Sequence, residues 1–233
     1  MLKNLLKTRM LLMKIKAFLL AVALIFSSIG LISCKKEEKD REYNEQEVLS
    51  AAKDLIKKSE LLNEIYYGYG IECDFNDMSN ANGNYFPADI LSCERFGITD
   101  VNDIKTLTRE CFTEAQSNYM INNTLSPVKD GSGEIVHFAR YYQEYNTLNL
   151  EEEKCIMVYS KYEPLLIDTV EYFYETVRVD DVEGEIIIVA INVSVTNSQG
   201  NVQNKTIKIE LLEEKNGFRI NSPTYARNTQ IQE

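Results

Sequence analysis

The spacing of apolar residues changes once along this chain of 233 residues, and the change sets the fold class. From Val48 to Tyr66 apolar side chains recur every three or four residues, which predicts a helix with one buried face. From about residue 134 they alternate with polar side chains, which predicts strands. Helices followed by an antiparallel meander predict an α+β fold, in which N-terminal helices pack on a curved antiparallel sheet of five to six strands.

Capping signals predict where the helices begin and end. Asn44 with Glu47 three residues later is a capping-box arrangement, which satisfies amide groups that the first turn leaves unbonded. Gly68 ends this first helix, because glycine interrupts a helical pattern. Two further helices are expected, one from about residue 100 and a short one over residues 114–121.

Turn chemistry divides the second half of the chain into strands. Asn197–Gly200 and the pair Asn216-Gly217 are hairpin turns, since Asn and Gly tolerate a positive φ. The second face of the fourth strand is also apolar at Ile186, Ile188 and Ala190. Either a loop or the segment 67–98 covers these residues, or they form an exposed strip that meets a partner. The strands are expected over residues 134–145, 154–161, 169–179, 185–196, 203–213 and 218–221.

The first 33 residues form a segment of their own. Five cations and no acid precede the apolar run Ala17–Ile32, which is shorter than the roughly 20 residues of a membrane-spanning helix. The run closes on Leu31-Ile32-Ser33-Cys34, which resembles the lipobox of bacterial lipoprotein signals. That resemblance implies cleavage before Cys34 and a diacylglycerol on its sulfur, with an uncleaved transmembrane anchor as the alternative. The expected parts are a signal peptide (1–33), a charged lipidated tether (34–43) and a single domain (44–228) on the extracytoplasmic side of the cell membrane.

Charge restricts the partners of the mature chain. Removing residues 1–33 takes away five of the 25 basic side chains and none of the 36 acidic ones, which leaves a formal charge of −16. Such a chain repels phosphate backbones and anionic lipid headgroups, so binding to nucleic acid is not expected. A basic protein partner or cations would complement it better.

Four further cysteines lie beyond the lipobox, an even number for a compartment outside the cytosol, where three complete pairings are possible. Cys73 and Cys93 flank the long loop of residues 67–98 and are the best candidates for a disulfide. Cys111 and Cys155 fall in predicted elements, where a free cysteine commonly serves as a small buried hydrophobe. Their spacing does not resemble a zinc or redox motif, so no metal or other cofactor is expected.

The sequence contains no recognisable catalytic motif. His137 is the only histidine, and no nucleophile signature surrounds a cysteine or serine that could pair with it. The chain has 14 tyrosines, of which Tyr66, Tyr67 and Tyr69 gather at the end of the first helix. Tyrosine suits contact surfaces because it offers a large area and a hydrogen bond at low entropic cost, although core or rim packing would use it equally. These three are the expected partner-binding residues of a protein that is not an enzyme.

The Phe112-Thr113 junction and the ending Lys215–Tyr225 resemble the closing hairpin of secreted, cone-shaped α+β domains. Two groups share it, the NTF2-like superfamily and the DL-endopeptidase inhibitor family of Gram-positive cell envelopes. Members of the second group bind and block peptidoglycan hydrolases. The resemblance implies an envelope protein that inhibits or modulates such a hydrolase, with an enzyme or small-ligand binder that uses an NTF2-like pocket as the alternative.

Overall fold

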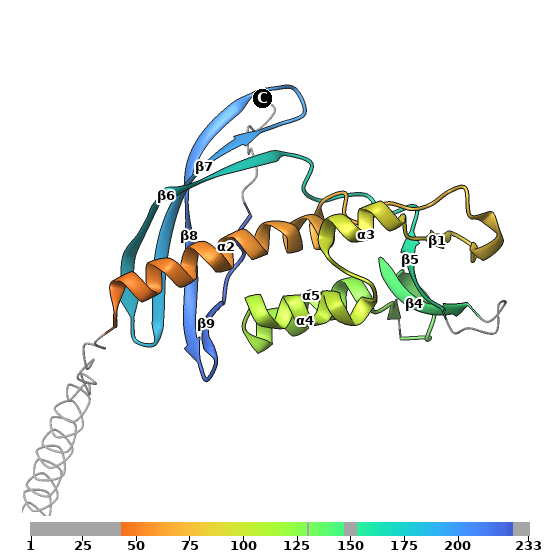
Figure 1. Ribbon diagram of the computed structural model, residues 1–233, viewed down its shortest axis with the longest axis horizontal. Helices are drawn as coiled ribbons and strands as arrows, with labels where there is room; N and C mark the ends of the chain where they lie inside the picture. Colours follow the sequence, from red (N-terminus) through yellow and green to blue (C-terminus); the bar gives the residue numbers. More distant parts are fainter. Residues whose placement is uncertain (1–42, 130, 147–152, 226–233) are drawn as a thin grey trace, which may run out of the picture. The chain divides into compact units, whose positions relative to one another are not determined.

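Helix α2 (Glu45–Tyr67) is the longest helix of the described part of the chain (Figure 1). The computed structural model describes residues 43–129, 131–146 and 153–225, and the chain divides into two units between residues 41 and 42. Cys34, the expected signal peptide and nearly all of the tether therefore lie outside the described residues. After α2 come the 3-10 helix η1 (Met78–Asn80), β1 (Tyr85–Pro87), α3 (Ile90–Phe96), α4 (Val101–Cys111), α5 (Glu114–Leu125), β2 (Val128–Lys129), β3 (Ile135–His137), β4 (Tyr141–Asn146), β5 (Glu153–Tyr159), β6 (Thr169–Glu183), β7 (Ile186–Thr196), β8 (Val202–Glu214) and β9 (Gly217–Ile220).

The three predicted helix starts are confirmed by their caps. The Asn44 side chain accepts hydrogen bonds from the amides of Gln46 and Glu47 at 3.1 and 3.4 Å. Asp100 and Asp103 form a reciprocal capping box at the start of α4, and Thr113 is the N-cap of α5. Each cap satisfies amide groups that lack a partner within the helix, so local sequence alone sets these boundaries.

The α+β class is confirmed, but the single sheet of five to six strands is wrong. The longest sheet has four antiparallel strands in the order β6-β7-β8-β9, whereas β1-β5-β4 form a three-stranded sheet and β2-β3 a separate pair. The chain leaves β5 and turns to the end of α2, where the amides of Leu165 and Leu166 donate to the carbonyl of Tyr67 at 2.7 and 2.8 Å. These amides are therefore not available to continue a strand ladder from β5 into β6.

The main core lies between α2 and one face of the four-stranded sheet. Figure 1 shows the long strands β6, β7 and β8 curving past α2. Alternate residues of β7, including Ile187, Val189 and Ile191, are at most 2% exposed and belong to the same apolar cluster as Ala52 and Ile56 of α2. Every second residue of β7 thus packs against the residues that recur every three or four positions along α2.

The second face of β7 carries the apolar strip expected at Ile186, Ile188 and Ala190. Ala190 is fully buried, and the two isoleucines are half-buried. Arg178 of β6 and Lys208 of β8 lie directly opposite Ala190 across the two ladders. The strip is therefore partly covered in the structure and is not a fully exposed apolar surface.

The segment 67–98 is an ordered part of the fold, held by backbone hydrogen bonds. The amide of Ala88 donates to the carbonyl of Ile156 on β5 at 2.8 Å, and β1 adds a third strand to β4 and β5. Cys73 and Cys93 are free thiols here, so the expected disulfide between them is not formed in the structure. The Sγ atom of Cys73 lies 3.8 Å from the carbonyl of Val158, and hydrogen bonds to β5 hold the segment without a covalent bridge.

Candidate functional site

The C-terminal end of α2 is the region in which the sequence places its tyrosine cluster, and it separates two hollows. One hollow has a volume of about 370 Å³ and is bordered by Gly68 and Tyr69. The other has about 710 Å³ and is bordered by Tyr66 and Tyr67. The turn that ends the helix is therefore a wall of both.

The structure separates the three tyrosines that the sequence grouped as partner contacts. Tyr66 is 1% exposed, and its hydroxyl lies 2.7 Å from the Thr108 hydroxyl inside the core, so it cannot be part of a contact surface. Tyr67 is half-buried, and its ring lies 5.2 Å from that of Tyr225. Tyr69 is 68% exposed and is the one of the three that presents most of its ring to solvent.

Arg140 holds this turn together, and the sequence did not single it out. Its guanidinium is 3% exposed and donates to the carbonyl of Ile65 at 2.7 Å, of Gly68 at 2.8 Å and of Tyr69 at 2.5 Å. These are carbonyls that the end of α2 leaves unbonded, and a cation there complements the negative end of the helix dipole. The guanidinium also lies 3.7 Å from the centre of the Tyr162 ring, a cation–π contact.

Gly70 permits this close approach. Its φ of +66° lies in the left-handed region that favours glycine. A Cβ atom at this position would overlap the Tyr141 hydroxyl and the Arg140 guanidinium. The turn therefore requires glycine both for its backbone angle and for the space that Arg140 occupies.

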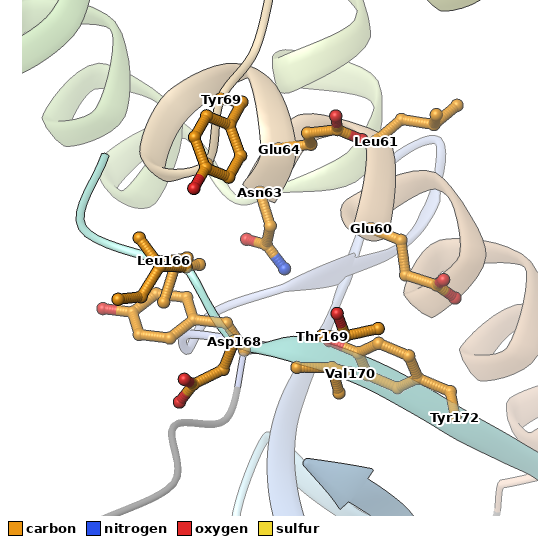
Figure 2. Close-up of a pocket in the computed structure, with 13 residues that line it drawn as sticks. Glu60, Leu61, Asn63, Glu64, Tyr69, Leu166, Asp168, Thr169, Val170 and Tyr172 are labelled. Atoms are coloured by element: carbon orange, nitrogen blue, oxygen red, sulfur yellow. The ribbon is translucent and has the colours of Figure 1, made fainter. Parts of the chain in front are cut away.

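We call the smaller hollow the acidic pocket. It is formed by residues 60–69 of α2 and its terminal turn, residues 166–172 at the start of β6, and Tyr225. Figure 2 shows Asn63 pointing between these two walls, while the carboxylates of Glu60 and Glu64 extend from α2. The Asn63 amide donates to the Thr224 hydroxyl at 2.9 Å, which fixes the inner wall.

The carboxylates of the acidic pocket differ in their surroundings. Burial raises the pKa of Glu60 to about 7, and nearby Lys57 only partly offsets this. The Oε1 atom of Glu60 is buried and has no hydrogen-bond partner among the described residues. Glu64 pairs with Arg95, whose guanidinium nitrogen lies 2.9 Å from its carboxylate oxygen. Glu60 is thus the carboxylate that would gain most from a donor or cation in the pocket.

Other candidate groups do not converge on a reactive centre within the described ranges. Burial raises the pKa of Cys111 to about 12, so this cysteine is a buried thiol rather than an activated nucleophile. His137 lies at the end of β3. In residues 43–129, 131–146 and 153–225 no cluster of three or more His, Cys, Asp or Glu side chains has a geometry that could hold a metal ion.

Comparison of the chain with models of protein families, with curated proteins and with solved structures finds no match. No helix in the described part of the chain is both long and apolar enough to cross a membrane.

Proposed function

We propose that this chain is a lipid-anchored protein of the cell envelope that binds a basic protein partner through the acidic pocket. The segment that closes on Cys34 supports the anchor. The observation that carries the binding proposal is that the exposed ring of Tyr69 lines the same pocket as the carboxylates of Glu60 and Glu64. A peptidoglycan hydrolase is the class of partner suggested by the resemblance of the closing hairpin.

A lysine or arginine side chain of the partner suits the acidic pocket in size and charge. A volume of about 370 Å³ exceeds what one such side chain needs, so backbone of the partner can enter as well. An ammonium or guanidinium group would supply the donor that Glu60 Oε1 lacks, and the Tyr69 ring would add a cation–π contact worth about 0.5–2 kcal/mol. The formal charge of −16 would also steer a basic partner towards this face.

The first experiment places a photocrosslinking amino acid at position 69 and, as the control, at position 75. Phe75 is also well exposed, 60% against 68% for Tyr69, but it does not line the acidic pocket. We expect a basic envelope protein to crosslink in cells from position 69 and not from position 75. The same partner crosslinked from both positions, or an acidic partner, would contradict the proposal.

The second experiment uses the purified partner and measures association rates at low and physiological salt. The Debye length falls from about 30 Å at 0.01 M to about 8 Å at 0.15 M, so steering between opposite charges should slow association as salt rises. Tyr69→Ala should speed dissociation, and Glu60→Gln should weaken the salt dependence. His137→Ala should leave binding unchanged in a folded variant, and a strict requirement for His137 would instead favour an enzyme.

A small-ligand binder or enzyme with an NTF2-like pocket is the second candidate, and the volume of the hollows is the observation that favours it. Both fall in the range of about 300–1,000 Å³ that is typical of ligand sites. Under this candidate, a small amine would bind the purified chain in the absence of any protein partner, with Glu60→Gln removing that binding.

A further inference from the structure

Four aromatic rings from different elements pack together away from the acidic pocket. The rings of Phe138 and Tyr159 are stacked, with centroids 5.1 Å apart and planes inclined by 17°. Tyr85 of β1 contacts both of them, and it also meets Tyr142 edge-on at 4.8 Å. The Tyr85 hydroxyl donates to the carbonyl of Ala139 at 2.6 Å, which fixes the centre of this cluster. Phe138, at its edge, is 41% exposed.

Two hollows flank the stacked pair, and Phe138 and Tyr159 line both. The hollow of about 710 Å³ extends towards Tyr119 of α5 and the end of α2. A hollow of about 450 Å³ extends towards the turn at residues 82–84. The two hollows meet at these two rings, and we call the pair of hollows the aromatic groove. Tyr119, 63% exposed, stands at one end of it.

The exposed charged side chains of the aromatic groove have no net charge. Its described lining has two exposed charged side chains of opposite sign, Lys161 and Glu163. Arg140 also borders the groove, but it is buried and donates to backbone carbonyls of the α2 turn. On a strongly acidic chain, a neutral groove lined by aromatic rings suits an uncharged ligand.

The polar groups that border the rings both donate and accept hydrogen bonds. They are the amides of Asn82, Asn84 and Asn123 and the hydroxyl of exposed Tyr119. A sugar hydroxyl likewise donates and accepts, and the flat C–H face of a pyranose ring packs on an aromatic ring. A proline-rich peptide would also suit aromatic rings, but proline has no amide N–H and would leave the amide oxygens of the groove without donors.

We propose that the aromatic groove binds a neutral oligosaccharide, with sugar rings packed on Phe138 and Tyr119 and hydroxyls bonded to the neighbouring amides. The two hollows, of about 710 and 450 Å³, leave room for more than one sugar unit. Tyr69 does not line the aromatic groove, although the turn that ends α2 borders both sites, so the proposal does not depend on the partner of the acidic pocket.

The test titrates the full chain, purified in a detergent without a sugar headgroup, with cellotetraose, maltotetraose and N-acetylated chitotetraose. Calorimetry gives the affinity, and tyrosine fluorescence, which no tryptophan masks in this chain, follows the same titration. We expect at least one of the three to bind with a dissociation constant of millimolar or tighter. Phe138→Ala should weaken this binding about tenfold or more, and Tyr69→Ala should leave it within twofold.

Asn123→Ala guards against a folding defect in Phe138→Ala, because Asn123 is exposed on α5 and its loss should not disturb the fold. We expect this variant to weaken saccharide binding several-fold at an unchanged melting temperature. Absence of binding by all three saccharides at 10 mM overturns the proposal. So does saccharide binding that survives both Phe138→Ala and Asn123→Ala, or a decaproline peptide that binds the groove while the saccharides do not.

Discussion

Replacing Arg140 by methionine tests whether a buried cation holds the end of α2 in place. Methionine keeps most of the length and apolar volume of the arginine stem, so the change removes mainly the guanidinium. Three carbonyls lose the guanidinium, those of Ile65, Gly68 and Tyr69, and the Ile65 carbonyl keeps a second donor, the Tyr141 hydroxyl at 3.1 Å. The carbonyl of Tyr69 belongs to an exposed residue and can be hydrated, whereas Ile65 and Gly68 are buried.

The two buried carbonyls set the expected cost. The Gly68 carbonyl, left buried without a partner, costs about 1–3 kcal/mol, and the Ile65 carbonyl loses a charged hydrogen bond worth about 1.5–3 kcal/mol while it keeps the Tyr141 hydroxyl. The lost contacts with the rings of Tyr162 and Tyr141 add to this. Burial disfavours the charged guanidinium and lowers the pKa of Arg140. Removing this buried charge therefore offsets part of the loss in stability. We expect a net loss of about 3 kcal/mol, which for a domain of this size is a fall of about 6–12 °C in melting temperature.

Urea unfolding followed by circular dichroism measures this loss. The matched control is Arg178→Met, since Arg178 is exposed on β6 and its nearest carbonyl, that of Thr176, lies at 3.5 Å. The control should change the free energy of unfolding by less than about 0.5 kcal/mol. A loss below about 1 kcal/mol for Arg140→Met, or one equal to that of the control, would show that the guanidinium does not hold the turn.

Four further outcomes are expected. The pKa of Glu60 in the folded protein is about 7, above its ordinary value of 4.5, so its contribution to stability is complete below pH 4.5 and is lost as the pH rises to 7. Glu60→Gln should remove this dependence on pH. Because the side chain is half-exposed, the variant should be more stable than the parent at pH 8 by only about 1–2 kcal/mol in urea unfolding. Tyr66→Phe should cost about 1 kcal/mol by the same assay, because it removes the hydrogen bond to Thr108. Gly70→Ala should cost at least about 2 kcal/mol and lower the melting temperature, since the backbone angle and the overlap with its neighbours both oppose it. Cys34→Ala should abolish incorporation of a fatty-acid analogue in metabolic labelling, and label retained on that variant would contradict the lipobox.

Local signals predicted the elements that local chemistry controls. Asn44 and Asp100 begin helices because their side chains bond amides two and three residues later. The turn at Asn216-Gly217 joins β8 to β9 because Gly217 adopts a φ of +100°. Such features depend on a few consecutive residues, and the printed sequence contains all of them.

Elements held by distant partners were not predictable in this way. Strand β1 has three residues and exists because β5 lies beside it, 70 positions later in the chain. Arg140 has no distinguishing neighbours in the sequence, and its importance follows from carbonyls near residue 65 that the fold brings to it. Tyr66 was misplaced for another reason, since it lies four residues after buried Leu62 and so belongs to the core stripe of α2. The helical spacing from Val48 to Tyr66 already put Tyr66 on the buried face, and grouping it with exposed Tyr69 ran against that pattern.

The turn that ends α2 stabilises the fold and also borders both proposed binding sites. This restricts which substitutions can test the sites. The carbonyl of Tyr67 accepts hydrogen bonds from Leu165, which borders the aromatic groove, and from Leu166, which borders the acidic pocket. Any substitution that moves this turn will therefore alter both hollows and the fold together. Variants that separate binding from stability must lie on the outer walls, as Tyr69 does in the acidic pocket and Asn123 in the aromatic groove. If the two sites are independent, Tyr69→Ala should weaken partner binding and leave saccharide binding, and Asn123→Ala should do the reverse.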